Sequence, residues 1–244
     1  MTRNASAQCV VLLWLLVLGG CATAPPSRTA TWMPMGSALV PPIARASRWS
    51  ASCFRMPFDA AGQPVWATDL VLADRVTAPL LKAYAQEIAL WRFHRRAAPD
   101  LAGHQFTLLV YAPPAIYAEI RQKIDASPTV HALQSAGRLS AIAHDCRASA
   151  QASLLEATSD PSWDPALQRA WPYFIMGVSA SWLALIQEFS GDIGAAEADL
   201  PAAYAEVEAR ITALWGAQGQ HAFLHHLSGV YGYRPLKIES WMNF

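Results

Sequence analysis

The chain has 244 residues, and its 18 basic and 18 acidic side chains give a formal net charge of zero. Because this balance contains no basic stripe, it argues against nucleic acid as a partner. Hydrophobic residues make up 53% of the sequence, which is enough for one good core, and the length fits a single main domain with appendages.

The first 21 residues combine a positive start, an apolar run and a thiol. Arg3 precedes the uninterrupted apolar segment 9–18, which as a helix would span roughly 15 Å. This is about half of a bilayer's hydrocarbon core, so the segment is typical of a secretion signal rather than a membrane span. The run ends in Leu18-Gly19-Gly20-Cys21, which resembles the lipobox of bacterial lipoproteins.

The lipobox resemblance implies that residues 1–20 are a signal peptide and that Cys21 becomes the lipidated first residue. Each buried methylene contributes about 0.8 kcal/mol, so three acyl chains such as palmitate would anchor the protein permanently. Ala22 follows the cysteine and, by the same resemblance, favours the outer membrane of a Gram-negative envelope, whereas a Gram-positive host would imply the cell surface. The alternative is an ordinary signal cleaved near residues 22–24, which would discard Cys21.

Residues 21–48 are rich in Pro, Ala and Ser and predict an extended tether that leads into one domain at 49–244. The domain contains Cys53 and Cys146, an even number in a compartment that would be oxidising. A disulfide between them would close a loop of about 90 residues and stabilise the domain by roughly 4 kcal/mol. Two buried free thiols are the alternative.

Turn residues, periodicity and proline positions predict the elements of the domain. The amino-terminal half is expected to contain a hairpin formed by 53–58 and 64–67, a helix over 78–97, an interior strand over 105–111, a helix from Pro113-Pro114, a helical turn from Pro128 and a second core strand over 139–143. The helix over 78–97 depends on apolar residues at spacings of three and four. The strand over 105–111 depends on apolar residues on both of its faces.

Helices dominate the second half. Asp164-Pro165 predicts the cap and first turn of a long helix that ends at Gly191. This helix is apolar on nearly every side, so we expect it to be the central buried helix. Further helices are predicted from Asp199 and across 221–231, and residues 236–242 are expected to form an edge strand. The sum is a helix-dominated α+β domain with a small, mostly antiparallel sheet.

Basic and histidine side chains gather where the helix over 78–97 is expected to meet the strand over 105–111. The cluster contains Arg92, His94, Arg95, Arg96, Asp100, His104 and Gln105. Of these, His94, Arg95, Arg96, His104 and Gln105 are the candidate ligand-binding residues, because guanidinium groups bind anions and carboxylates. His104 could act as a general base if a carboxylate, with Asp145 as the candidate, oriented it. The alternative is a solvated helix end whose basic residues complement the helix dipole.

His221 and His225 lie four residues apart on a predicted helix, the spacing of a zinc-binding pair. The segment reads His-Ala-Phe-Leu-His-His and lacks the glutamate of the metalloprotease pattern, and no third ligand is identifiable. Two polar residues on a half-exposed helix face are the alternative. The sequence therefore predicts no cofactor, and no metal beyond this weak pair.

The segments 94–100 and 171–177 resemble uncharacterised proteobacterial lipoproteins, and this resemblance implies no activity. The sequence therefore predicts a lipoprotein anchored in the outer membrane and facing the periplasm. It would have a binding or assembly role toward an envelope protein or a cell-wall component, with no nucleic-acid partner. The alternative is an envelope hydrolase or transferase that uses His104 with Asp145 or Arg96.

Overall fold

The computed structural model describes residues 46–147, 151–194 and 199–233. The predicted signal peptide, Cys21, most of the predicted tether and the edge strand expected at 236–242 lie outside the described residues. All the described residues fall within one unit, Ser37–Phe244. The first strand begins at Arg48, so the tether predicted over 21–48 overlaps the sheet by one residue.

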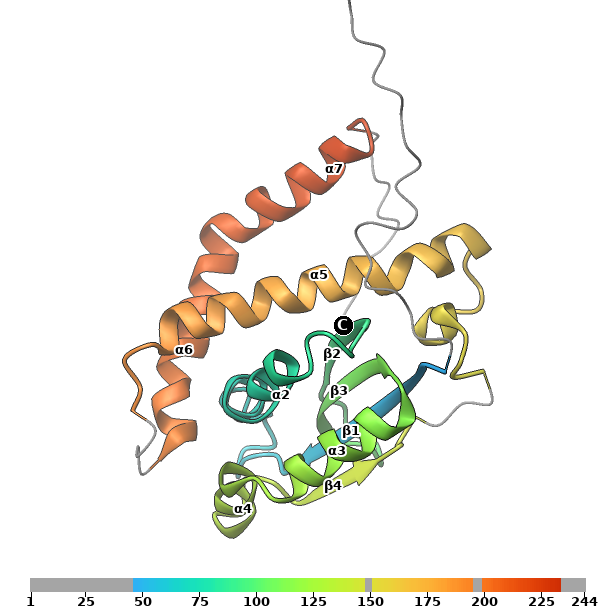
Figure 1. Ribbon diagram of the computed structural model, residues 1–244. Coiled ribbons are helices and arrows are strands. Elements are labelled where there is room, and N and C mark those ends of the chain that lie inside the picture. Colours follow the sequence, from blue (N-terminus) through green and yellow to red (C-terminus); the bar gives the residue numbers. More distant parts are fainter. Residues whose placement is uncertain (1–45, 148–150, 195–198, 234–244) are drawn as a thin grey trace, which may run out of the picture. The chain divides into compact units, whose positions relative to one another are not determined.

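A four-stranded antiparallel sheet with the strand order β2-β3-β1-β4 organises the fold (Figure 1). The strands are β1 (Arg48–Met56), β2 (Leu90–Arg96), β3 (His104–Ala112) and β4 (Ala141–His144). All nine residues of β3 are buried, as expected for an interior strand with neighbours on both sides. The sheet and its helices confirm the predicted α+β class.

The helices begin where the sequence places caps and prolines. They are α1 (Ala67–Val71), the π-helical η1 (Leu72–Thr77), α2 (Ala78–Ala83), α3 (Pro114–Asp125), α4 (Pro128–Ser135), the 3₁₀ turn η2 (Leu155–Thr158), α5 (Pro165–Ser190), α6 (Leu200–Leu214), the π-helical η3 (Trp215–His225) and α7 (His226–Val230). The side chains of Ser127, Asp164 and Asp199 each accept a hydrogen bond from a first-turn backbone N–H. Proline stands at the first or second helical position in all three cases, where its missing N–H has no helical partner to lose.

The sheet separates two apolar clusters because side chains alternate along each strand. The main core contains Phe54, Phe93 and Phe106 of the sheet, packed against α1, η1, α3 and α5. The opposite face carries a smaller cluster formed by Trp49, Ala51, Ala89, Leu90, Leu109 and Tyr111, which is covered by Ala152, Leu155, Ala157 and Met176. The exposed edge of β2 is closed by α5, where Ser179 Oγ accepts a hydrogen bond from Phe93 N at 3.1 Å.

A buried polar joint attaches α6 to η1. Tyr204 is fully buried, and its hydroxyl donates to Asp74 Oδ2 and accepts from Arg75 Nε at 2.6 Å. Burial and the hydrogen bond to Asp74 raise the pKa of the Tyr204 phenol to about 12. Arg75 also donates to the carbonyl of Ile193 at 2.7 Å, so every charge at this joint has a partner.

The helix predicted over 78–97 was wrong in its second half. The helix ends at Ala83, and residues 90–96 form β2 instead. Trp91 and Phe93 alternate with Arg92 and His94. This period of two is typical of a strand rather than a helix, and the segment pairs with β3. The predicted hairpin was confirmed only at its turn, where an antiparallel bridge joins Phe58 to Pro64 and Asp59 N donates to the carbonyl of Gln63. Residues 53–56 of its first arm instead belong to β1, which pairs with β3 and β4.

The long helix from Asp164-Pro165 exists as predicted, but it is not the central buried helix. Among its residues, Pro172, Ser179, Leu183, Ile186 and Ser190 are buried. Phe174 and Val178 are 43% and 46% exposed. The strand predicted at 139–143 is likewise an edge strand rather than a core strand, since β4 pairs only with β1 in the described sheet and Ala141 and Ala143 are exposed. Composition indicated apolarity correctly in both segments but could not indicate how much neighbouring chain covers them.

A disulfide joins Cys53 of β1 to Cys146, two residues after the end of β4. Cys53 is buried and shares its face of the sheet with Ala51 and Trp49. The crosslink therefore holds the segment that follows β4 against the face of the smaller apolar cluster. Arg147 is the next residue in the chain.

Candidate anion-binding site

Arginine and histidine side chains of β2 lie on the same face of the sheet as the smaller apolar cluster. Alternation along β2 places Arg92, His94 and Arg96 on this face, and their neighbours across β3 are Leu109, Thr107 and Gln105. Arg147 joins them from the disulfide-linked segment, with its Nη2 3.2 Å from His94 Nδ1. The structure thus collects basic groups from two segments that lie about 50 residues apart in the sequence.

Arg92 is the unusual member of this group, because it is only 6% exposed and its Nε atom has no hydrogen-bond partner. No ion pair or hydrogen bond connects its guanidinium to any part of the chain that the structure describes. Burial, and then the positive charge of Arg147, lower the pKa of Arg92 to about 10. A buried cation without a partner is energetically costly, so Arg92 is a candidate for binding an anion rather than a residue that stabilises the fold.

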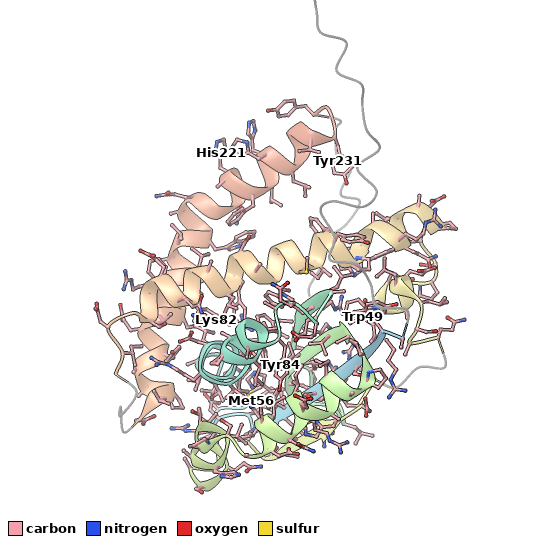
Figure 2. The ribbon with its side chains drawn as sticks, viewed as in Figure 1. Trp49, Met56, Lys82, Tyr84, His221 and Tyr231 are labelled. Atoms are coloured by element: carbon pink, nitrogen blue, oxygen red, sulfur yellow. A yellow bond between two sulfur atoms is a disulfide. The ribbon has the colours of Figure 1, made fainter. Side chains whose placement is uncertain are left out.

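Arg92 and Arg147 both line a cavity of about 290 Å³. Its walls include the apolar residues Trp49, Ala51, Leu109, Ala152 and Ala157, and Trp49 lies near the amino end of β1 (Figure 2). Thr158 adds a buried hydroxyl that has no hydrogen-bond partner among the described residues. We call this site the arginine pocket and define its polar members as Arg92, Arg147 and Thr158.

His94 is a neutral support for Arg147. Burial lowers the pKa of His94 to about 4, and the charges of Arg147, Arg92 and Arg96 act in the same direction. At neutral pH the imidazole is therefore uncharged, and its Nδ1 accepts a hydrogen bond from Arg147, which can only donate. Burial and the charge of Arg96 also lower the pKa of Arg147 itself, an otherwise exposed residue at the rim.

Arg95 and His104, which the sequence placed in the same ligand-binding group, lie on the opposite face of the sheet. Their shared partner is Asp69 of α1, which is fully buried. Asp69 accepts from Arg95 Nε at 2.7 Å and from His104 Nε2 at 3.0 Å. The Arg95 guanidinium lies 4.7 Å from the ring centroids of both Trp66 and Trp182, so this cluster is compensated on every side.

His104 has the carboxylate partner expected of a general base but not the access. Its ring is fully buried against Trp66 and Phe58, and its second nitrogen, Nδ1, has no partner among the described residues. A buried imidazole packed between aromatic rings cannot reach a substrate, so the cluster with Asp69 orders the core. The one signal in the sequence for Asp69 is a carboxylate within an otherwise apolar segment.

The predicted pairing of His104 with Asp145 was wrong. The register places His104 opposite Met56 of β1, whereas the backbone N–H of Asp145 donates to the carbonyl of Ala51. Five residues of strand separate these points, roughly 16 Å. Asp145 has a φ of 52°, and this left-handed turn leads directly into the disulfide.

The remaining predicted residues are near the arginine pocket but outside it. Arg96 donates to Asp100 at 2.5 Å, so its charge is compensated, and no hydrogen bond links it to His104. Gln105 is buried on the same face as Arg96 and pairs with it across the two strands. Arg92, Arg147 and Thr158 were missing from the predicted ligand-binding set. The arginines clustered at 92–96 are the sequence signal that could have suggested Arg92, whereas no local pattern marks Arg147 or Thr158.

A serine, a histidine and an aspartate also form a hydrogen-bonded chain near β4. Ser52 Oγ lies 2.9 Å from His144 Nδ1, and His144 Nε2 lies 2.9 Å from Asp125 Oδ1. The Ser52 side chain is fully buried and also contacts Tyr117 OH at 3.1 Å. A nucleophile must reach its substrate, so this chain joins β1, β4 and α3 rather than forming a catalytic triad.

His221 and His225 stack on each other in η3, with ring centroids 4.9 Å apart (Figure 2 labels His221). Tyr233 OH lies 3.3 Å from His225 Nε2. In the described ranges, no group of three or more His, Cys, Asp or Glu residues could hold a metal ion. The pair therefore has no third ligand in that part of the chain.

Within residues 46–147, 151–194 and 199–233, no helix has both the length and the apolar character needed to cross a bilayer. No protein-family model, curated protein or solved structure matches this chain, so the function has to be argued from its own geometry.

Proposed function

We propose that this protein is an outer-membrane lipoprotein, anchored through Cys21, whose periplasm-facing domain binds a small anionic ligand in the arginine pocket. The single observation that supports the binding role is Arg92, a buried guanidinium with no carboxylate partner in the described chain, at the wall of a cavity. Folding gains nothing from such a charge, whereas an anion that enters the cavity would compensate it.

The contrast with a purely structural arginine supports the same proposal. Arg75 and Arg95 are also partly buried, but each has a carboxylate within 3.3 Å. The arginine pocket instead offers two guanidinium groups, a free hydroxyl and an apolar wall, which is the composition of a site for a small amphiphilic anion. The support for the anchor is separate and comes from Leu18-Gly19-Gly20-Cys21 in the sequence.

The binding role is tested with the full-length lipoprotein purified in detergent under oxidising conditions. Calorimetric titration with inorganic phosphate, sulfate and acetate should show one saturable site, and Arg92→Gln should abolish it. Arg96→Gln removes the same charge from the same strand but from a compensated pair, so it should change affinity less than about twofold. Binding that is equal in the wild type and in Arg92→Gln would refute the proposed site.

The anchor is tested by intact-mass analysis of the protein extracted from envelopes. An increase in mass corresponding to acyl chains on Cys21 is expected, together with the loss of residues 1–20. Cys21→Ala should release the chain from the membrane fraction. An unacylated chain, or a Cys21→Ala protein that still fractionates with envelopes, would overturn the anchoring part and leave the pocket unaffected.

A further inference from the structure

We infer that the ligand of the arginine pocket is a phosphate monoester in its dianionic form, with a small apolar substituent. This inference rests on the proposed function and names the ligand class that the pocket selects. It follows from three properties of the pocket, which are its net charge, its hydrogen-bond donors and its size.

The two cations of the pocket favour a ligand with two negative charges over a ligand with one. Arg92 and Arg147 are both cationic at neutral pH, and His94 beside them is neutral. The carboxylate of Asp100 accepts a hydrogen bond from Arg96. No carboxylate raises the pKa of Arg92. A carboxylate ligand would compensate one of the two guanidinium charges, whereas a phosphate monoester carries between −1.5 and −2 at pH 7.

The hydrogen-bond donors of the arginine pocket fit a ligand with three acceptor oxygens better than a ligand with two. Each guanidinium presents a planar fork of N–H groups that binds phosphate oxygens in pairs. Arg92, which is buried, and Arg147, which is exposed at the rim, line the cavity together with Thr158, whose hydroxyl has no hydrogen-bond partner among the described residues. A carboxylate presents its lone pairs in one plane, whereas the three oxygens of a phosphate monoester point in three directions, so the phosphate fits groups that surround the cavity better.

The size and the apolar wall limit the rest of the ligand. A cavity of about 290 Å³ is at the small end of ligand sites, too small to enclose a nucleotide. Trp49, Leu109 and Ala157 form the apolar part of the wall, which fits a short alkyl or aryl group next to the phosphate. The same phosphate monoester could belong to a free metabolite or to the headgroup of a lipid.

The first experiment titrates the full-length oxidised protein with phenyl phosphate and with benzoate, which present the same ring on a dianion and on a monoanion. At pH 7.5 phenyl phosphate should bind at least about tenfold more tightly, the factor that corresponds to one additional compensated charge. Arg147→Gln should bring the ratio of the two affinities close to one, while Arg96→Gln should leave it unchanged. Equal affinities in the wild type would overturn the inference.

The second experiment repeats the phenyl phosphate titration between pH 7.5 and pH 5. The second phosphate pKa is near 6, so only about a tenth of the ligand is dianionic at pH 5 and the affinity should fall about tenfold. Arg92 and Arg147 stay protonated over this range, and His94, with its pKa at about 4, stays mostly neutral. Affinity that does not change with pH would overturn the inference, because it would show that a monoanion suffices.

Vesicles distinguish the two sources of the ligand. The assay uses the Cys21→Ala protein, because the acyl anchor would carry the lipidated form into any vesicle. Sedimentation with phosphatidic acid vesicles but not with phosphatidylglycerol vesicles would identify a lipid monoester, since phosphatidylglycerol is a diester with a single charge. Binding of soluble phenyl phosphate without preference between the vesicles would identify a free metabolite. Both outcomes support a phosphate monoester. If no anion binds, or if Arg92→Gln binds equally well, the proposed function itself fails, and this result differs from the loss of selectivity alone.

Discussion

Arginine side chains on the two faces of β2 differ in whether a carboxylate compensates their charge. Arg95 points to the main core, where Asp69 accepts its hydrogen bond and two tryptophan rings enclose it. Arg92, three residues earlier, points to the other face and has no carboxylate partner within the described chain. The difference separates a charge that stabilises the fold from a charge that is available to a ligand.

Removing the carboxylate charge of Asp69, which compensates Arg95, should have the largest effect on stability. Asp69→Asn leaves the Arg95 guanidinium without its countercharge in the core and weakens the hydrogen bond from His104. We expect a loss of about 3 to 5 kcal/mol in the free energy of unfolding, measured by urea denaturation. Asp100→Asn, which removes the carboxylate of an exposed pair, is the control and should change stability little. Equal effects of the two variants would contradict the contrast.

Removing the crosslink on the arginine face should have a comparable effect. The disulfide joins residues 93 apart, and in the chain-entropy model a loop of this length contributes roughly 4 kcal/mol. The double variant with Cys53→Ser and Cys146→Ser should therefore unfold at lower urea concentration than the oxidised wild type, and the reduced wild type should match it. A double variant as stable as the oxidised protein would show that the crosslink does not restrict the unfolded chain.

Removing the uncompensated charge of Arg92 should increase the free energy of unfolding instead of lowering it. Arg92→Met keeps most of the side-chain volume and eliminates a buried cation, so we expect the free energy of unfolding to rise by about 1 to 3 kcal/mol while anion binding is lost. Arg95→Met is the matched control on the same strand and should destabilise, because Asp69 would lose its cation. Thermal or urea unfolding of both variants measures this, and destabilisation by Arg92→Met would indicate that Arg92 is structural.

The smallest expected effect is a dependence of stability on pH through His94. Its pKa is about 4 in the folded protein and near 6.5 in the unfolded chain, so between these values the unfolded state binds more protons. Stability should therefore fall as the pH drops from 6.5 to 4, by roughly 1 to 2 kcal/mol because solvent screens part of the effect. His94→Gln should show a smaller slope across this window, and an unchanged slope would assign the effect to other groups.

Local signals predicted the parts of the fold that depend on local chemistry. The caps at Asp164 and Asp199 and the proline that follows each of them determine where α5 and α6 begin, and the apolar alternation of residues 105–111 marks β3. The exposure of α5 and the edge position of β4 depend on which segments pack beside them, which periodicity within one segment does not contain.

The site was predicted in part for the same reason. The density of basic residues around 92–105 pointed to an anion, but alternation along β2 divides these residues between two faces, and the sequence had suggested a helix there. Arg147 and Thr158 reach the pocket only through tertiary packing. The buried partner of His104 turned out to be Asp69, 35 residues earlier in the chain, and no local pattern relates these two positions.

Because Arg147 directly follows Cys146, the affinity for the ligand should depend on whether the disulfide is oxidised or reduced. Reduction removes the covalent bond that fixes residue 146 to β1, so we expect Arg147 to be held beside β2 less firmly in the reduced chain. Under the export proposed above, the crosslink would close only after oxidation outside the cytosol. The reduced precursor would therefore bind phosphoesters more weakly than the exported, oxidised protein.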